Sequence, residues 1–189
     1  NFLVEGFFTN LSDVFVLEDI GRDEQGNLIK ERRNGSGAKV MGLTLEGKAV
    51  LTSWLSVQAG ATLQRSRYKE SEKWSSDENV PAEKKMFRTP NTYGYFTSTV
   101  TPFKQFTVAL SGTYTGSMLV QHLAGYIPLD KTVETPDFFD MNVKLAYEFP
   151  IYKEMRLEFN TGIQNLFNAY QSDFDQGKDR DSAYIYGPA

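Results

Sequence analysis

The stretch FFDMNVKLAYEFPIYKEMRLEFNTGIQNLFN, residues 138–168, decides the fold class of this chain. Apolar and polar side chains alternate along residues 139–149, and they alternate again along residues 155–163. Successive side chains of an extended backbone point to opposite sides, so a period of two residues predicts a β-strand. The sequence PIYKE, residues 150–154, separates the two runs as a short turn. The stretch therefore predicts an antiparallel hairpin.

The hairpin also predicts which side chains face one another across the strands. If the turn is centred on Tyr152, Glu148 lies opposite Arg156 and Tyr147 lies opposite Leu157. One face of the hairpin then pairs charges and the other pairs apolar side chains, and both kinds of pair stabilise a sheet.

The composition excludes several classes of function. The 189 residues include 20 basic and 24 acidic side chains, and this negative balance is unlike the basic surface of a nucleic-acid-binding protein. There is no cysteine and one histidine, His122, which excludes a Cys–His catalytic pair and a multi-histidine metal site. The G-x-S-x-G motif of serine hydrolases is absent as well. We expect neither an enzyme nor a bound cofactor.

The connections between the other predicted strands alternate in length. Strand patterns cover residues 39–51, 55–69, 93–101 and 106–118, and residues 1–20 form one long bulged strand or a short hairpin. Short turns fall near residues 53, 103 and 152, whereas residues 20–35, 70–90, 121–137 and 168–182 form long connections. Outer-membrane barrels of up-and-down strands have short turns on one rim and long loops on the other.

The predicted fold class is therefore all-β, with antiparallel up-and-down strands. We expect a section of a large transmembrane β-barrel, about eight strands that do not close alone, as one continuous curved sheet with two unpaired edges. A soluble antiparallel sheet with one wet face alternates in the same way and stays open as an alternative.

A barrel in lipid places apolar side chains outside and tolerates polar ones in its lumen. The apolar side chains of residues 139–149 and 106–118 are therefore expected to face lipid. Four charged side chains are expected to face the lumen or a plug: Lys144, Glu148, Arg156 and Glu158. Aromatic side chains near the short turns are typical of the girdle at a membrane interface: Trp54, Phe103, Tyr147 and Tyr152.

The motif GIQNLFN, residues 162–168, resembles one in the C-terminal barrel portion of TonB-dependent outer-membrane receptors. The segment that follows it is similar to the one that leads such receptors into their last strand. The stretches TPNTYGYF, residues 89–96, and ALSGTYTGSM, residues 109–118, are similar to the same family, particularly its Bacteroides-like members. The resemblance covers nearly the whole chain, residues 1–189, as one barrel portion without a second domain.

The resemblance implies a barrel of about 22 strands with a plugged lumen. It implies a place in the outer membrane of a Gram-negative cell and the import of a scarce nutrient, such as an iron–siderophore complex, cobalamin or a glycan. The implied partners are outer-membrane lipid, a plug domain of the same parent chain, the TonB complex that supplies energy, and an extracellular small-molecule ligand.

The chain departs from the full family pattern in three ways. It lacks the plug and its TonB-contacting box, and it holds only about a third of the strands. Residues 184–189 read as the beginning of a new strand, with Ala189 where the family ends on an aromatic residue. We expect a piece of a longer protein, truncated at both ends.

Two sets of loop residues are candidates for binding a ligand. Asp173, Asp175, Asp179 and Asp181 have a spacing that can aim oxygens at a calcium ion, although the distal glutamate of an EF-hand is missing; a solvated acidic loop is the alternative. Aromatic side chains near the long loops can stack on a ligand or pack against one another: Trp74, Phe87, His122 and Tyr126. The glycine-containing run RRNGSG, residues 32–37, lacks the Gly-Lys-Ser/Thr of a phosphate loop and is expected to lead flexibly into a strand.

Three functions stay open on the sequence alone. The first is the barrel portion of a TonB-dependent importer. The second is a soluble β-sheet module that recognises carbohydrate or a protein partner through its long loops. The third is an outer-membrane barrel that does not transport, such as an adhesin.

Overall fold

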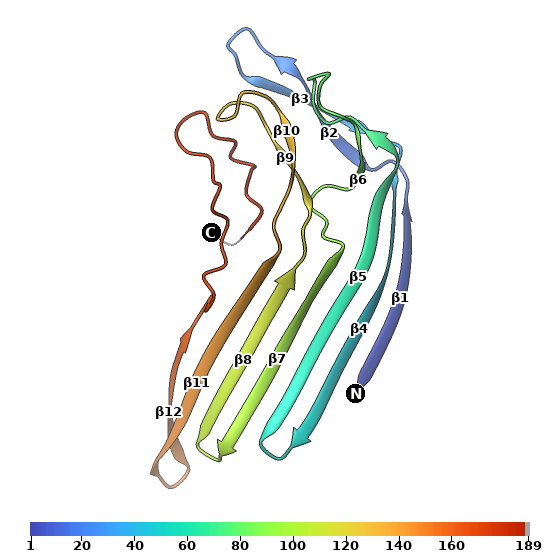
Figure 1. The fold of residues 1–189 in the computed structure, drawn as a ribbon. Coiled ribbons are helices and arrows are strands. Elements are labelled where there is room, and N and C mark those ends of the chain that lie inside the picture. Colours follow the sequence, from blue (N-terminus) through green and yellow to red (C-terminus); the bar gives the residue numbers. More distant parts are fainter. Residues whose placement is uncertain (188–189) are drawn as a thin grey trace.

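One curved antiparallel sheet dominates the computed structural model, which describes residues 1–187 (Figure 1). Its long strands follow the order β1-β4-β5-β7-β8-β11-β12, and a short strand, β6, extends the wall beside β5. The bounds are β1 (Phe2–Leu11), β4 (Ala38–Thr52), β5 (Leu55–Glu72), β6 (Glu83–Lys85), β7 (Thr92–Phe103), β8 (Phe106–Thr115), β11 (Phe138–Tyr152) and β12 (Met155–Ile163). The prediction of an all-β section that does not close is confirmed, because β1 and β12 each pair with one neighbour among the described residues.

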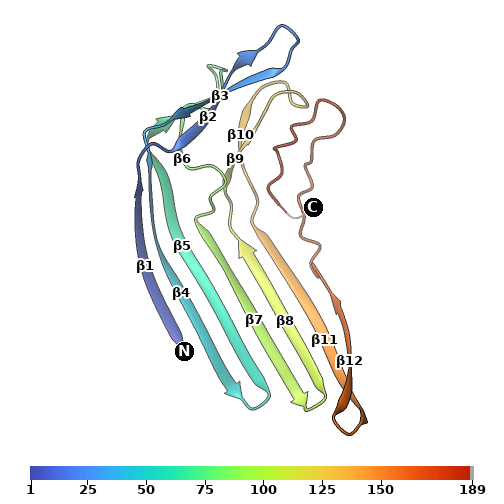
Figure 2. The same ribbon diagram turned by 180° about the vertical axis from the view of Figure 1, so that it is seen from behind.

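The short turns and the long connections lie at opposite ends of this sheet. The turns β4–β5, β7–β8 and β11–β12 lie at the lower end in Figure 1, and the long connections gather at the upper end in both views (Figures 1 and 2). Two further hairpins stand at the upper end: β2 (Phe15–Arg22) with β3 (Leu28–Asn34), and β9 (Leu119–His122) with β10 (Lys131–Glu134). The described residues contain no helix able to cross a membrane.

The strand register sorts side chains into one apolar face and one polar face across the whole sheet. Paired residues of antiparallel strands share a face, so the face of Leu43 continues through Leu63, its partner on β5. We call this face the apolar wall; it includes Phe8, Met41, Leu43, Leu45, Leu63, Phe96, Val108, Leu110, Val143, Leu145, Tyr147 and Phe159. We call the other face the polar wall; it includes Thr44, Glu46, Thr62, Tyr95, Thr97, Ser111, Asn142, Lys144, Asn160 and Gln164.

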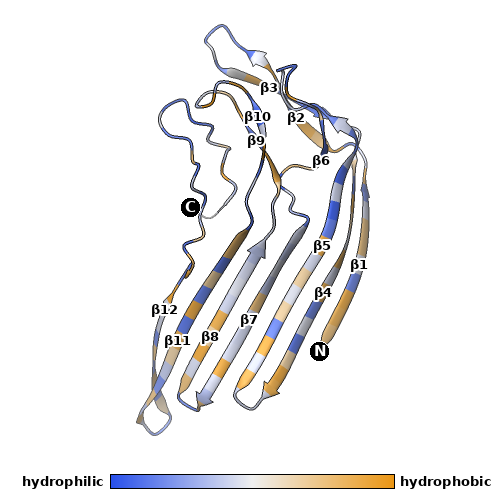
Figure 3. Ribbon diagram, viewed as in Figure 1, coloured by the Kyte–Doolittle hydropathy of each residue, from blue (hydrophilic) through white to orange (hydrophobic). Residues whose placement is uncertain are grey.

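On β4 and β5 the apolar wall is the more exposed of the two, whereas on β7 the exposed side chains of Tyr93, Tyr95 and Thr97 belong to the polar wall. Leu63 is 59% exposed, whereas Thr62, the next residue on β5, is 5% exposed. Figure 3 shows the same alternation of hydropathy along β4, β5 and β11. A soluble sheet buries its apolar face, so the distribution on β4 and β5 is the reverse of what water alone selects.

The packed apolar core lies at the loop end and not on the sheet. The buried apolar side chains of residues 1–187 are at strand starts or in the long connections: Val16, Ala38, Trp74, Val80, Val120, Phe138 and Tyr184. Within residues 1–187, no second layer covers either wall (Figures 1 and 2).

The predicted register of the β11–β12 hairpin is wrong by two residues. Glu148 pairs with Glu158 and Pro150 pairs with Arg156, because the turn is made by Lys153 and Glu154 and not centred on Tyr152. Lys153 adopts a positive φ of 48°, and a register shift between Pro150 and Tyr152 accommodates the residue between them. A shift of two residues leaves each side chain on its predicted face.

Both predictions for residues 1–20 are wrong. The first strand ends at Leu11, and the chain turns at Asp13, which has a positive φ of 54°. The second run becomes β2, which leaves the main sheet and pairs with β3. The backbone N–H of Gly35 donates to the Val14 carbonyl at 2.8 Å and fixes the base of this hairpin.

The new strand predicted at residues 184–189 does not form within the described part of the chain. The N–H of Tyr186 donates to Gln171 Oε1 at 2.9 Å, and the Ile185 carbonyl accepts from Arg88 Nη1 at 2.8 Å. These contacts use backbone groups that a strand would pair. Ala189, predicted to replace a closing aromatic residue, lies outside the described residues.

A glycine under an aromatic ring fixes the middle of the apolar wall. Gly112 pairs with Phe96, and the Phe96 ring occupies the space that a Gly112 side chain would need. The same ring stacks on Phe139 with 6.4 Å between ring centroids. Gly6, also on the apolar wall, has no atom within 4 Å of the place where a Cβ would stand.

We predict that Gly112→Val lowers the free energy of unfolding by about 1–3 kcal/mol, because the valine displaces Phe96 from Gly112 and Phe139. Gly6→Val is the matched control and is expected to leave the unfolding free energy unchanged or slightly higher, since valine favours strands. Denaturant titration followed by tryptophan fluorescence measures both. Equal effects of the two substitutions would contradict the packing role of Phe96.

Candidate functional site

Two of the places that bring polar side chains together are the polar wall and a cluster of loops at its upper end. The polar wall is hollowed. One hollow of about 700 Å³ is lined from β7, β8, β11 and β12, by residues that include Thr97, Ser111, Asn142, Lys144, Asn160 and Gln164. A second hollow, of about 450 Å³, lies beside Glu46, Tyr93 and Tyr95. The hollows place the polar wall on the inner side of the sheet's curve.

The four charges predicted for the lumen share the polar wall. Lys144 and Glu148 alternate with apolar residues on β11, and Arg156 and Glu158 do so on β12. Arg156 Nη1 lies 2.9 Å from Glu148 Oε2, so the ion pair forms diagonally although the two residues are not directly opposite. Both side chains are exposed, and such a pair contributes about 0–1 kcal/mol. That these residues face a lumen or a plug stays a prediction.

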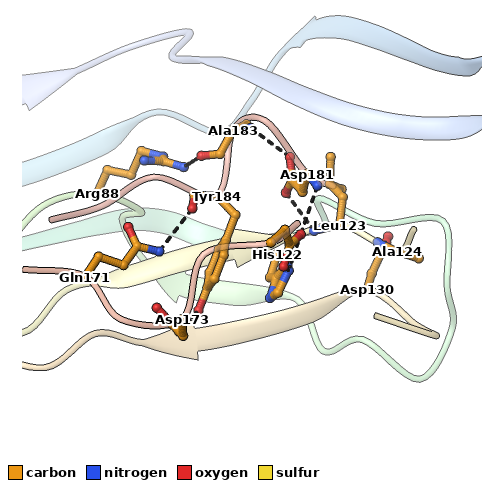
Figure 4. A network of polar contacts seen from close by, with 11 residues as sticks. Arg88, His122, Leu123, Ala124, Asp130, Gln171, Asp173, Asp181, Ala183 and Tyr184 are labelled. Atoms are coloured by element: carbon orange, nitrogen blue, oxygen red, sulfur yellow. Dashed lines mark hydrogen bonds and ion pairs between the residues drawn. The ribbon is translucent and has the colours of Figure 1, made fainter. Parts of the chain in front are cut away.

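A second polar site is built where residues 169–187 fold back on the β9–β10 hairpin (Figure 4). We call it the loop cluster: residues 119–134 and 169–187 with Trp74, Ser75, Phe87 and Arg88. His122 is 7% exposed and its Nε2 lies 2.9 Å from both carboxylate oxygens of Asp175, whose side chain is 2% exposed. The His122 ring also stacks on Tyr184 with 3.6 Å between centroids. The contacts of the His122 ring with Asp175 and Tyr184 hold residues 169–187 against the β9–β10 hairpin.

Asp173 is the second anchor of residues 169–187. Its carboxylate accepts from the Tyr184 hydroxyl at 2.7 Å and from the Tyr186 hydroxyl at 2.6 Å. Burial alone raises the pKa of Asp173, but hydrogen bonds from Tyr186, Tyr184 and Gln171 outweigh it and hold the pKa below its usual value. Burial, together with the nearby Asp173 carboxylate, raises the pKa of Tyr184 and raises the pKa of Tyr186 to about 12.

Two further carboxylates bind backbone N–H groups of the loops. Asp181 accepts from the N–H groups of Leu123 and Ala183, each at 2.9 Å. Asp130 accepts from the Ala124 N–H at 2.7 Å and from the Ser75 hydroxyl. Side-chain acceptors thus replace the strand partners that these loop backbones lack.

The calcium interpretation of residues 173–181 finds no geometry to support it. Within residues 1–187, no group of three or more His, Asp or Glu side chains is arranged to hold a metal ion. Asp173, Asp175 and Asp181 accept hydrogen bonds from protein donors, while the Asp179 side chain makes no hydrogen bond or ion pair with a described residue. The alternative of a solvated loop is wrong for Asp175, which is buried against His122.

Of the four side chains predicted to contact a ligand, three are packed against other rings and one is exposed. Trp74 is 2% exposed and meets Phe87 edge to face, with 5.9 Å between centroids. His122 packs on Tyr184, whereas Tyr126 is 54% exposed. Packing therefore occupies Trp74, Phe87 and His122 in this structure, and a role for any of the four in binding a ligand stays a prediction.

Sequence reasoning missed the group that anchors the β2–β3 hairpin. Glu72 accepts from the Ser36 N–H at 2.7 Å and from the Ser36 hydroxyl at 2.9 Å, and Arg33 lies 3.3 Å from its other oxygen. Arg33 also contacts Glu18 at 2.7 Å. The run of residues 32–37, expected to be a flexible lead, is therefore tied to the end of β5. Ser36 and Glu72 are 36 positions apart, and no local pattern indicates their contact.

No protein-family model and no curated protein sequence matches this chain. Two solved structures have the same fold over almost its whole length. The ferric-catecholate import receptor Fiu of E. coli, in a closed form, has a TM-score of 0.61 and 18% identity over 98% of this chain and 23% of its own. The siderophore receptor PiuA of Acinetobacter baumannii has a TM-score of 0.61 and 17% identity over 100% of this chain and 24% of its own.

The likeness identifies the fold: the open sheet has the arrangement of one section of a TonB-dependent receptor barrel. This chain spans about a quarter of the length of the two receptors. Neither neighbour supports the more specific resemblance to Bacteroides-like members.

We predict that Asp173→Ala releases residues 169–187 from the β9–β10 hairpin, because the charged acceptor of two tyrosine hydroxyls is lost. Hydrogen exchange of the backbone amides in this segment is expected to show a local opening free energy lower by about 1–3 kcal/mol. Asp179→Ala removes an equal charge without a hydrogen bond and is expected to leave exchange unchanged. Equal exchange in the two variants would contradict the anchoring role of Asp173.

The same anchor predicts a pH dependence at both ends of the scale. The pKa of Tyr186 is raised from 10.0 to about 12, so its contribution to docking is complete below pH 10 and is lost as the pH rises through about 12. The pKa of Asp173 is lowered from 3.8, so its contribution is present above pH 3.8 and is lost as the pH falls through the lowered value. Ultraviolet absorbance of tyrosinate, taken as wild type minus Tyr186→Phe, measures the first. A midpoint near 10 would contradict the contact with Asp173.

Proposed function

We propose that this chain is part of the barrel wall of an outer-membrane transporter that imports a ferric siderophore with energy supplied through TonB. The observation that carries the proposal is the sorting of side chains into an apolar wall and a polar wall over seven strands. The apolar wall is continuous, its large side chains on β4, β5 and β12 are exposed, and the polar wall is hollowed. Large contiguous apolar surfaces are rare on soluble proteins, whereas hydrocarbon surrounding a barrel requires one.

The aromatic residues near the short turns support the same placement. Phe103 stacks on Phe106 with 5.5 Å between centroids, and Tyr147 lies 4.6 Å from Phe149. Trp54 and Tyr152, at neighbouring turns, are exposed. Aromatic rings concentrate at the boundary between hydrocarbon and water, so the short turns lie at one boundary and the loop cluster lies beyond the other.

The hollowed polar wall supports a lumen that holds a plug domain. Lys144, Asn160 and Gln164 line the larger hollow, and their side chains make no hydrogen bond or ion pair with a described residue. A plug of the same parent chain would complete these hydrogen bonds, and TonB would act through that plug. This reading gives Lys144, Glu148, Arg156 and Glu158 the role of lumen charges.

The siderophore is the nutrient class best supported of the three considered. Both structural neighbours are named for siderophore or ferric-catecholate import. Cobalamin and glycans have no such support. A soluble binding module is less well supported, because it would leave the apolar wall in water.

We predict that nitroxide labels on neighbouring residues report opposite surroundings in outer membranes containing the full protein. The chain has no cysteine, so Leu145→Cys and Lys144→Cys each provide one labelling position in it. A label at Leu145 is expected to collide more with oxygen, which concentrates in lipid, and a label at Lys144 more with a water-soluble nickel chelate. Leu157→Cys and Glu158→Cys form a second matched pair. Water access at Leu145 and Leu157 would contradict the membrane placement.

Transport is tested in the same cells under iron limitation. Growth on a ferric catecholate is expected to require both this protein and TonB, and growth that depends on cobalamin is expected to be unaffected by its loss. If the labels at Leu145 and Leu157 are exposed to lipid but loss of the protein has no effect on growth under iron limitation, the barrel placement stands and the import of a siderophore is contradicted.

A further inference from the structure

Three cations stand on the apolar wall at its loop end. Lys39 on β4 pairs directly with Arg67 on β5, and Arg65 pairs with Met41 one step below. All three side chains are exposed. The next paired positions toward the short turns are apolar, Leu43 with Leu63 and Leu45 with Ala61. The cations therefore form one edge of the apolar wall; we call them the basic edge.

The basic edge has no counter-charge on the protein. Neither Lys39 nor Arg65 nor Arg67 forms an ion pair or a side-chain hydrogen bond with any described residue. From Phe2 to Asn10 on β1, Lys39 to Leu51 on β4 and Leu55 to Arg67 on β5, the positions on this face carry no carboxylate. Glu5 and Glu46 belong to the polar wall. Lys85, which pairs with Arg67, is neutralised by Glu134 at 3.0 Å.

Like charges placed directly opposite each other destabilise a sheet, so an anion from outside the chain would stabilise the pair of Lys39 and Arg67. Their height along the wall indicates where that anion lies. Ten residues separate Leu55 from Arg65, about 33 Å along a strand and about 25 Å of height at a tilt of about 40°. This matches the apolar band of outer-membrane barrels, so the basic edge stands at the level of lipid headgroups.

We propose that Lys39, Arg65 and Arg67 bind the phosphate groups of an anionic lipid whose acyl chains lie along the apolar wall. Phosphate suits the group, because arginine binds it with two parallel hydrogen bonds and lysine adds a point charge. Phe8, Met41, Leu43 and Leu63 offer the acyl chains an exposed surface directly below. This inference rests on the membrane placement of the proposed function.

The experiment uses the full protein, delipidated in neutral detergent, and native mass spectrometry to count bound lipid. The probe is a diphosphorylated glucosamine-based glycolipid, compared with the same lipid after enzymatic removal of its phosphates. Wild type is expected to retain the phosphorylated lipid, and the triple variant Lys39→Gln, Arg65→Gln, Arg67→Gln is expected to bind it at least about fivefold more weakly. The dephosphorylated lipid is expected to bind both proteins equally.

A matched control removes three cations elsewhere. Arg32→Gln, Lys84→Gln and Lys178→Gln change the same net charge at exposed positions without ion pairs among the described residues, and this variant is expected to bind like wild type. Equal loss in both triple variants, or equal binding of the dephosphorylated lipid to wild type, would overturn the phosphate site. Nitroxide labels at Met41 and Leu63 separate the two proposals. Lipid exposure there with no effect of the triple variant refutes the phosphate site alone, and water exposure refutes the membrane placement.

Discussion

The structure depends on one constraint: apolar and polar side chains alternate along the long strands of the sheet, and the pairing from β1 to β12 keeps each kind on its own face. Each cross-strand pair shares a face, so a slip of one residue at any hairpin would move lysines and glutamates onto the apolar wall beyond it. The irregular steps of the β4–β5, β7–β8 and β11–β12 pairings lie next to the short turns, and the pairing between them is regular. The two walls are thereby maintained without a packed core between them.

The wall was predictable from the sequence because its information is local. The alternation along residues 139–149 and the short turn at residues 150–154 are enough to place each side chain on its face, even though the predicted pairing was two residues off. The loop end was not predictable. Arg88 contacts Ile185, Asp181 contacts Leu123 and Glu72 contacts Ser36, and nothing near any of these residues indicates its partner. β2 was misplaced for a different reason, since the turn before it depends on the positive φ of Asp13, which the sequence does not indicate.

The acidic composition has a structural explanation in the loop cluster. Irregular backbone leaves N–H groups without strand partners, and Asp181, Asp130 and Asp175 accept from such groups. Three of the four aspartates in residues 173–181, whose spacing resembled a cation site, instead accept hydrogen bonds from separate donors of the protein. Asp173 differs from the others because its donors are phenols. Burial and the contact with Asp173 together raise the pKa values of Tyr184 and Tyr186, while the hydrogen bonds from these phenols lower the pKa of Asp173.

The separation in sequence of the loop contacts has a consequence for the order of folding. The hairpins β4–β5, β7–β8 and β11–β12 close over two-residue turns, so each can form as soon as its own residues are available. The clamp of Arg88 on Ile185 spans 97 positions and must wait for the end of the segment. Closure of such a long loop carries an entropic cost that the short hairpins avoid. The rim of loops is therefore expected to be the last part to become rigid and the first to loosen, on a wall that stays assembled beneath it.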